Sequence, residues 1–214
     1  MLLLNEQFSI LFIARSGSSY LQDTLNNHPN ITCTNEDMFV NHIYFNRSLN
    51  PDYDYHPCTR HGYSGIKVPL TILEKHPLGS SFWENNIFRK PVIICTRNFL
   101  LSYISYELVK ANNSAWSQLK YKNPILINIS DAMRYIKTLN EMLEPFKHLS
   151  NQKILWLNYE DGVENNYYKA LNFIGAHKYK PVVSYTKQTD REYKHLIINY
   201  EQMMKSPLGS FLKM

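Results

Sequence analysis

Short apolar runs alternate with longer stretches in which hydrophobic and polar residues are mixed. Three of the runs are continuous enough to predict buried β-strands, at residues 10–14, 92–96 and 154–157. Residues 31–34 and 63–68 predict two further short strands, the second of them ended by Pro69.

Between these runs, apolar residues recur at steps of three and four, which predicts amphipathic helices. Leu21 and Leu25 stand one turn apart and open the first helix. The clearest pattern covers residues 131–144, with Ser130 as a candidate N-cap and Pro145 as the end of the helix or a kink in it. The other predicted helices are a short turn near residues 80–86, residues 99–110 capped by Asn98, residues 167–174 stopped by Gly175, and a last long helix marked by Tyr193, Leu196, Ile197, Tyr200 and Met204.

Buried strands that alternate with helices predict an α/β protein with a central parallel sheet covered by helices. We expect one domain over residues 1–214, because this length can bury one substantial core. Two stretches, at about 37–62 and 111–129, lack a regular pattern and are expected to form loops or a lid over the site. Ligands of such sheets bind beyond the carboxyl ends of the strands, where Arg15, Arg97 and Tyr159 fall.

The composition indicates which class of ligand and which cellular compartment suit this protein. The net charge of +5, from 23 Lys+Arg against 18 Asp+Glu, fits an anionic ligand but is too mild and dispersed to predict nucleic-acid binding. The three cysteines show no metal-ligand spacing and suit a reducing compartment. The leucines at residues 2–4 are too few for a signal sequence, and no apolar run is long enough to span a membrane. We therefore expect a cytoplasmic protein.

The loop between the first strand and the first helix is the strongest candidate for binding chemistry. Backbone N–H groups at a helix N-terminus point toward one spot, and the helix dipole favours negative charge there. Gly17 lets the backbone approach a ligand, Ser18 and Ser19 add hydroxyl donors, and Arg15 adds a planar positive group. The alternative interpretation is a Ser/Gly turn that merely caps an ordinary helix.

This loop differs from the phosphate loop of nucleotide kinases. In the pattern G-x-x-x-x-G-K-[ST], a lysine follows the last glycine, whereas Ser18 follows Gly17 here and the first glycine is also absent. A kinase uses that lysine and magnesium to neutralise the transferred phosphoryl group. The loop therefore suits a less charged group, or a phosphate that is held rather than transferred.

Three strand ends together carry a recognisable set of motifs. The first is A-R-S-G-S-S-Y-L at residues 14–21, followed by N-H-P at residues 27–29. The second is C-T-R-N at residues 95–98, with Ser105 eight positions after its arginine, and the third is N-Y-E-D at residues 158–161. Their order and spacing resemble the sulfotransferases that use 3′-phosphoadenosine 5′-phosphosulfate, most closely the carbohydrate branch.

The resemblance implies a P-loop NTPase-like sulfotransferase fold and a role for each matching residue. The first loop would bind the 5′-phosphosulfate of the donor, and Arg15 would also take part in catalysis. The arginine-to-serine element would bind the 3′-phosphate, with Lys187 as a further contact. The residues so assigned to the donor are Arg15, Ser16, Gly17, Ser18, Ser19, Tyr20, Arg97, Ser105 and Lys187.

Sulfuryl transfer needs a base for the acceptor hydroxyl. The resemblance to the carbohydrate branch assigns this role to Glu36, because the small-molecule branch carries a histidine that is missing from G-I-K-V-P-L at residues 65–70. His56 and His61 are the alternatives. Lys67 lies at the end of its strand and faces the same edge of the sheet, where we expect it to act on the leaving phosphate or the acceptor. The resemblance gives residues 159–161 a mainly structural role.

The leading hypothesis is therefore a sulfotransferase whose acceptor is a hydroxyl of a carbohydrate or another small molecule. For a sulfotransferase, the small size and the missing membrane anchor indicate a cytoplasmic enzyme of bacterial or viral type rather than a Golgi enzyme. No metal is expected, because sulfuryl transfer can proceed without magnesium. A P-loop kinase is an alternative, but Ser18 and Asn158 stand where its lysine and its magnesium ligand would be needed. An inactive nucleotide-binding module is the third possibility, against which stands the complete set Arg15, Arg97 and Ser105. No motif in the irregular stretches identifies the acceptor.

Overall fold

The structure is a computed structural model that describes residues 8–34, 62–74, 76–88, 90–113, 121–149, 153–181 and 193–212. The chain divides into two compact units. Unit 1 comprises Met1–Thr96 and Pro145–Ser184, and unit 2 comprises Arg97–Glu144 and Tyr185–Met214. The expectation of a single domain stays a prediction.

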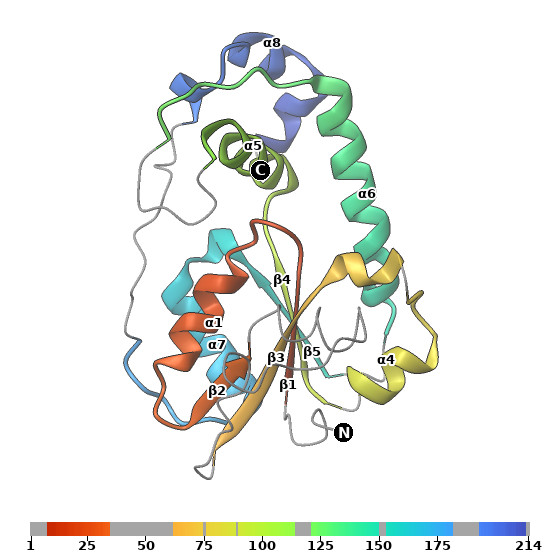
Figure 1. The fold of residues 1–214 in the computed structure, drawn as a ribbon, viewed down its shortest axis with the longest axis vertical. Coiled ribbons are helices and arrows are strands. Elements are labelled where there is room, and N and C mark those ends of the chain that lie inside the picture. Colours follow the sequence, from red (N-terminus) through yellow and green to blue (C-terminus); the bar gives the residue numbers. More distant parts are fainter. Residues whose placement is uncertain are drawn as a thin grey trace. The chain divides into compact units, whose positions relative to one another are not determined.

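Unit 1 is built on a parallel sheet of five strands in the order β2-β3-β1-β4-β5 (Figure 1). All four neighbouring pairs are parallel, which confirms the predicted α/β class. The five predicted strands are present with ends shifted by at most two residues. Their bounds are β1 Phe8–Phe12, β2 Ile31–Thr34, β3 Tyr63–Pro69, β4 Val92–Thr96 and β5 Ile154–Asn158.

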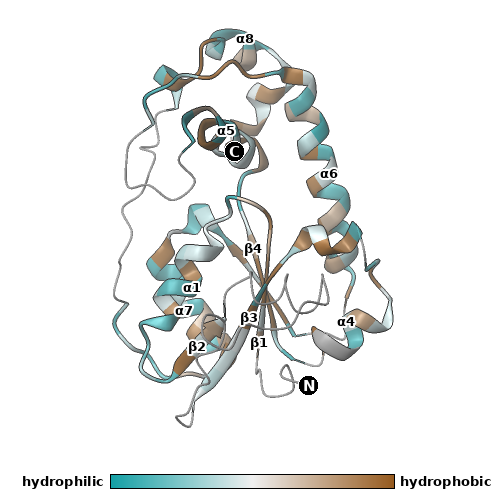
Figure 2. Ribbon diagram, in the orientation of Figure 1, coloured by the Kyte–Doolittle hydropathy of each residue, from teal (hydrophilic) through white to brown (hydrophobic). Residues whose placement is uncertain are grey.

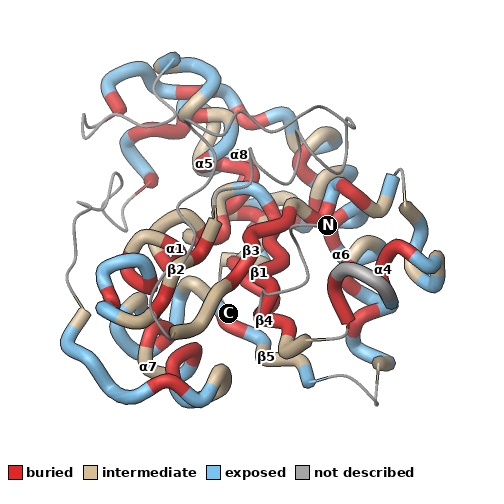
Figure 3. Tube along the Cα trace, turned by 60° about the horizontal axis from the view of Figure 1, so that its bottom comes forward, coloured by how far each residue is buried: buried red, intermediate tan, exposed pale blue. Residues whose placement is uncertain are grey.

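The inner strands are the most apolar because helices cover both of their faces. Every residue of β1 is buried, and β4 is buried over its first four residues (Figure 3). The same strands carry the hydrophobic colours of the sheet in Figure 2. At the edges the burial is weaker: β2 alternates between buried and half-buried positions, and on β5 only Leu157 is buried.

Helices α1 (Ser18–Asn26) and α7 (Val163–Ile174) share one hydrophobic core with the sheet. Leu21 and Leu25, the pair that predicted the first helix, are both buried in it. A second set of contacts surrounds Trp83 of α4 (Ser81–Asn86), whose indole packs against the rings of Phe88 and Phe146 at 5.6 Å between centroids. Short 3-10 turns at Leu70–Glu74 and Tyr159–Asp161 follow β3 and β5.

Unit 2 has a helical core formed by α5 (Phe99–Asn112), most of α6 (Ile129–Lys147) and the C-terminal segment, residues 193–212. The ribbon of α6 alternates between hydrophilic and hydrophobic colours in Figure 2, as its sequence pattern predicted. Asn98 caps α5 as predicted, because its Oδ1 accepts from the N–H groups of Leu100 and Leu101 at 3.1 and 3.2 Å.

The start and end of α6 differ from the prediction. Asn128, not Ser130, caps the helix, because its Oδ1 accepts from the N–H groups of Ser130 and Asp131 at 3.0 and 3.2 Å. The helix also continues past Pro145 to Lys147 instead of ending there. Gly175 ends α7 as predicted, in the left-handed conformation with φ 79°.

The prediction of a last long helix from Tyr193 to Met204 is wrong. The segment forms a 3-10 turn at Lys194–Leu196, a bridge at Ile197, the short helix α8 (Tyr200–Lys205) and a 3-10 helix at Pro207–Leu212. Tertiary contacts override the helical spacing. Ile197 pairs in parallel with Ile125, and the side-chain amide of Asn199 both donates to the carbonyl of Ile127 and accepts from its N–H, each at 2.9 Å.

Candidate functional site

The loop after β1 has an unusual backbone. Arg15 lies in the left-handed region with φ 63°, and Gly17 has φ 76°. Ser16 N–H donates to Ile13 O at 3.3 Å, so the chain turns back sharply at the end of the strand. A non-glycine residue in this region is uncommon, and such conformations concentrate at functional sites.

The N-terminus of α1 has no side-chain cap, because its capping residue is Gly17. The first bond of the helix runs from Leu21 N–H to Gly17 O at 3.0 Å. The N–H groups of Ser18, Ser19 and Tyr20 precede that bond, so the helix itself does not use them. Together with the helix dipole, they form a local anion site at the carboxyl edge of the sheet.

A lysine reaches this loop from the neighbouring strand. Lys67 stands opposite Ile10 in the pairing of β1 with β3, and only 1% of its surface is exposed. Its Nζ donates to Ser19 Oγ at 2.8 Å and lies 4.6 Å from the centroid of the Phe12 ring. The sequence placed Lys67 at this edge of the sheet, and the structure adds its contact with the loop.

The ring of Tyr159 covers Gly17. A Cβ added at Gly17 would lie 2.3 Å from Tyr159 Cδ2, so only glycine fits beside this ring. Tyr20 lies in the same environment, since burial, then Tyr159 and then Glu164 raise its pKa. The loop is therefore held between the sheet and an aromatic side chain supplied by the exit of β5.

A small cavity of about 20 Å³ lies below the loop, with room for about one water molecule. Its lining includes Ser16, Gly17, Tyr159, Cys95 and Asn166. Ser16 Oγ and Asn166 Oδ1 are buried there and have no hydrogen-bond partner within the part of the chain that the structure describes. Burial raises the pKa of the Cys95 thiol to about 12, so this cysteine is not a reactive thiolate near neutral pH.

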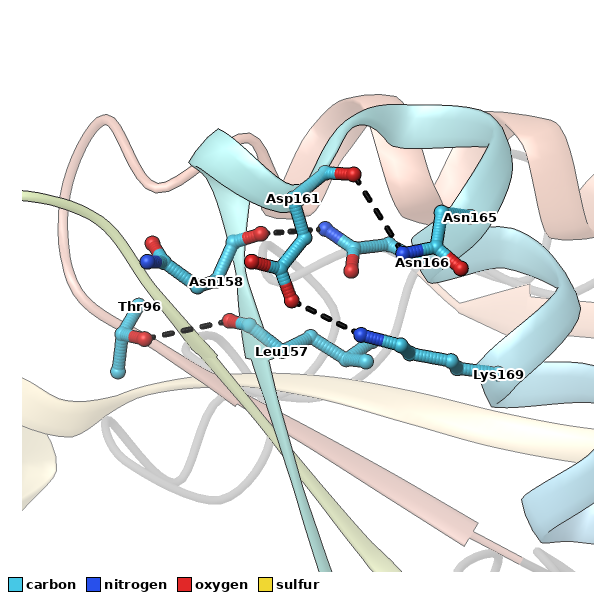
Figure 4. Close-up of polar contacts among 7 residues, drawn as sticks. All are labelled: Thr96, Leu157, Asn158, Asp161, Asn165, Asn166 and Lys169. Carbon is cyan, nitrogen blue, oxygen red and sulfur yellow. Dashed lines mark hydrogen bonds and ion pairs between the residues drawn. The ribbon is translucent and has the colours of Figure 1, made fainter.

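The exit of β5 is fixed by side chains (Figure 4). Thr96 Oγ1 donates to Leu157 O at 3.2 Å, and Asn166 Nδ2 donates to Asn158 O at 2.7 Å. The carboxylate of Asp161 points toward Lys169 of α7 and pairs with it at 2.9 Å. These contacts agree with the structural role expected for residues 159–161.

The N-H-P motif also has a structural contact. His28 is buried, and its Nδ1 accepts from Asn30 N–H at 3.1 Å. The other ring nitrogen, Nε2, therefore carries the proton and donates to His177 O at 3.1 Å. The motif ties the end of α1 to the chain that follows α7.

Arg97 is the first residue of unit 2. It follows β4 directly in the chain and is buried. Its Nη2 donates to the hydroxyl of Tyr193 at 2.7 Å. Ser105 is buried on α5, two turns further along. Arg97 and Ser105 are the residues predicted to bind one phosphate. Tyr193 could not be predicted as a partner of Arg97, because it lies 96 residues away along the chain.

Two hydroxyl groups of unit 2 pair with each other. Tyr135 OH and Ser102 Oγ are 3.0 Å apart, which joins α6 to α5. Burial, the largest effect, raises the pKa of Tyr135, while the hydrogen bond with Ser102 and the charge of Arg97 act in the opposite direction.

Several predicted residues lie outside the described ranges: Glu36, His56, His61 and Lys187. Among the described residues, no group of three or more His, Cys, Asp and Glu side chains could hold a metal ion. Within the same residues, no helix has both the length and the apolar character needed to cross a membrane.

Neither a protein-family model nor a curated protein matches this sequence. Among solved structures, the chain is similar to the crystal structure of a sulfotransferase from Alicyclobacillus acidocaldarius, with a TM-score of 0.56 and 14% sequence identity. The match covers 97% of this chain and 93% of that chain. At this identity the likeness shows a shared fold, which is the α/β fold described above.

Proposed function

We propose that the protein is a sulfotransferase that moves a sulfuryl group from 3′-phosphoadenosine 5′-phosphosulfate to a hydroxyl of a carbohydrate or another small acceptor. The observation that carries the proposal is the uncapped N-terminus of α1, met by the buried Lys67 from β3. The fold shared with a solved sulfotransferase adds support.

The loop suits the 5′ end of the donor. Arg15, Ser18, Ser19 and the backbone N–H groups of the first helical turn offer donors to a phosphate, and Ser16 brings a buried hydroxyl with no described partner. The bound donor would supply an activated sulfuryl group whose departure leaves negative charge on the 5′-phosphate. Arg15 and Lys67 would stabilise that charge, which is how preorganised donors accelerate a reaction.

The 3′-phosphate would be held by Arg97 and Ser105, with Lys187 as a further contact. A buried arginine forms strong charge-assisted hydrogen bonds with phosphate, and its planar group can bind two oxygens at once. The rings of Tyr20 and Tyr159 lie beside the loop and could contact the nucleoside. Glu36 is proposed as the base that accepts the proton of the acceptor hydroxyl.

A P-loop kinase remains the rival enzyme class, because Lys67 brings a lysine to the loop. Two observations speak against a kinase. Strand β5 ends in Asn158, where a kinase needs an acidic magnesium ligand. The carboxylate of Asp161, three residues further on, pairs with Lys169. An inactive nucleotide-binding module would keep the same contacts without turnover.

Two measurements separate these possibilities. We expect adenosine 3′,5′-bisphosphate at a hundredfold excess over its Kd to raise Tm by about 5–10 °C, and magnesium-ATP to raise it less. Transfer of labelled sulfate from the donor to a panel of hydroxyl acceptors then tests activity. Phosphoryl transfer from ATP would replace the proposal with the kinase, and bisphosphate binding without transfer to any acceptor would favour the inactive module.

A further inference from the structure

The C-terminal segment reaches two consecutive residues at the start of unit 2. Tyr193 accepts from Arg97 Nη2 at 2.7 Å, and the carbonyl of Phe211 accepts from Asn98 Nδ2 at 2.6 Å. Asn98 uses its other side-chain atom, Oδ1, to cap α5. The residue that carries the positive charge and the residue that starts the helix are therefore both fixed by the same distant segment.

The bond between Arg97 and Tyr193 orients the guanidinium without cancelling its charge, because a phenol is neutral. Both side chains are at least nine-tenths buried, with 9% and 8% of their surface exposed. A free arginine loses substantial rotamer freedom when it binds a ligand, and a side chain that is already fixed loses less. The hydrogen bond that Arg97 donates to Tyr193 therefore favours the geometry in which Arg97 can bind an anion.

The helix that follows Arg97 carries further hydroxyl groups. Ser102 of α5 is hydrogen-bonded to Tyr135 at 3.0 Å, and Ser105 is buried on the same helix. Arginine and neutral hydroxyl donors are both groups that bind phosphate.

We propose that Tyr193 is a positioning residue that presets the Arg97 guanidinium for the 3′-phosphate of the nucleotide. The C-terminal segment thereby becomes part of this anion site and determines how strongly the protein prefers a 3′-phosphorylated nucleotide. The inference rests on the proposed function, which assigns the 3′-phosphate to Arg97.

The test compares the affinities of two nucleotides, adenosine 3′,5′-bisphosphate and adenosine 5′-phosphate. Tyr193→Phe keeps the ring packed in the core of unit 2 and removes only the hydroxyl. The preference is the Kd of adenosine 5′-phosphate divided by the Kd of adenosine 3′,5′-bisphosphate. We expect this ratio to fall about three- to tenfold in the variant, the effect of one hydrogen bond. Tyr200→Phe, the same change in the same segment on a residue that packs against the same core, should leave the ratio unchanged.

A double-mutant cycle separates positioning from general destabilisation. In the Arg97→Ala background, Tyr193→Phe should cause no further loss of preference, since the group that it positions is gone. A purely structural role for Tyr193 would weaken both nucleotides equally and leave the ratio intact, and that result would overturn the inference.

The ratio measured for the wild type tests the assignment of Arg97 separately from the role of Tyr193. A wild-type protein that binds both nucleotides equally would overturn the assignment of Arg97 and, with it, the inference. A wild-type preference that persists unchanged in Tyr193→Phe would overturn the role of Tyr193 alone and leave the proposed function standing.

Discussion

The turns after β1 and β4 leave neighbouring parallel strands and both lead into helices, yet they use the helix N-terminus in opposite ways. After β1, Gly17 caps α1 without a side chain, so the first N–H groups are available to a ligand. After β4, the side chain of Asn98 accepts from the N–H groups of Leu100 and Leu101, so those donors are already used.

The difference determines which kind of group can bind an anion at each turn. At the first turn the donors are consecutive backbone groups, supplemented by Lys67 from one strand away. At the second turn the candidate is a side chain, Arg97, which is hydrogen-bonded to Tyr193 from the far end of the chain. We therefore expect substitutions near the first turn to affect turnover, and substitutions at the second to affect binding.

The largest effect is expected at Glu36, the proposed base. Glu36→Gln should lower turnover by roughly two to four decades, the usual contribution of a general base. The Kd of adenosine 3′,5′-bisphosphate, measured by calorimetry, should hardly change because Glu36 would contact the acceptor. Loss of donor binding with turnover intact would move the base elsewhere, first to His56 or His61.

Lys67→Met should lower turnover by roughly two to three decades, because it removes one donor to the charge that develops on the leaving phosphate. Methionine keeps most of the side-chain volume and removes a buried amino group, so Tm should not fall. Steady-state turnover and thermal unfolding measure the two effects. If turnover fell only in proportion to a lower Tm, the role of Lys67 would be structural.

Arg15→Ala should reduce turnover by about 2–4 kcal/mol in activation free energy, and should weaken binding of the spent nucleotide less than that. Arg15→Lys should recover part of the loss, since it keeps the charge but not the planar group. Arg15→Gly is the matched control for the backbone. It relieves the left-handed conformation, so it should be at least as stable as Arg15→Ala and equally slow. Equal losses of turnover and affinity would show that Arg15 only binds the nucleotide.

Gly17→Ala should lower the free energy of unfolding by about 2–5 kcal/mol. Left-handed backbone costs an alanine about 1–2 kcal/mol, and overlap with the Tyr159 ring adds about 1–3 kcal/mol. Gly79→Ala is the control, because Gly79 has φ 93° but nothing within 4 Å of an added Cβ. Chemical denaturation of both variants isolates the contact with Tyr159, and equal losses would mean that the ring moves aside freely.

Arg97→Ala should weaken binding of adenosine 3′,5′-bisphosphate by about 1.5–3 kcal/mol, the value of a hydrogen bond to a charged group. Binding of adenosine 5′-phosphate should hardly change, and turnover at saturating donor should stay close to that of the wild type. Titration calorimetry with both nucleotides checks this. A variant that still distinguished them as well as the wild type would refute the assignment of the 3′-phosphate to Arg97.

The sequence determined the sheet and the first turn because their signals are local. Apolar runs of four or five residues predicted β1, β4 and β5, and residues 15–19 are contiguous, so the start of α1 could be predicted from Gly17 and its neighbours. Asn98 was predictable for the same reason, since a cap and the N–H groups that it satisfies lie within a few residues.

Only the tertiary structure decided the contacts between segments that lie far apart in the sequence. Helical spacing from Tyr193 to Met204 predicted one long helix. Instead, the side-chain amide of Asn199 bonds to both backbone groups of Ile127, and Ile197 pairs with Ile125, each 72 positions earlier in the chain. The contacts of Lys67 with Ser19 and of Tyr193 with Arg97 join residues 48 and 96 positions apart. No local pattern encodes such pairs, because they depend on which strands become neighbours and on where the chain returns after long connections.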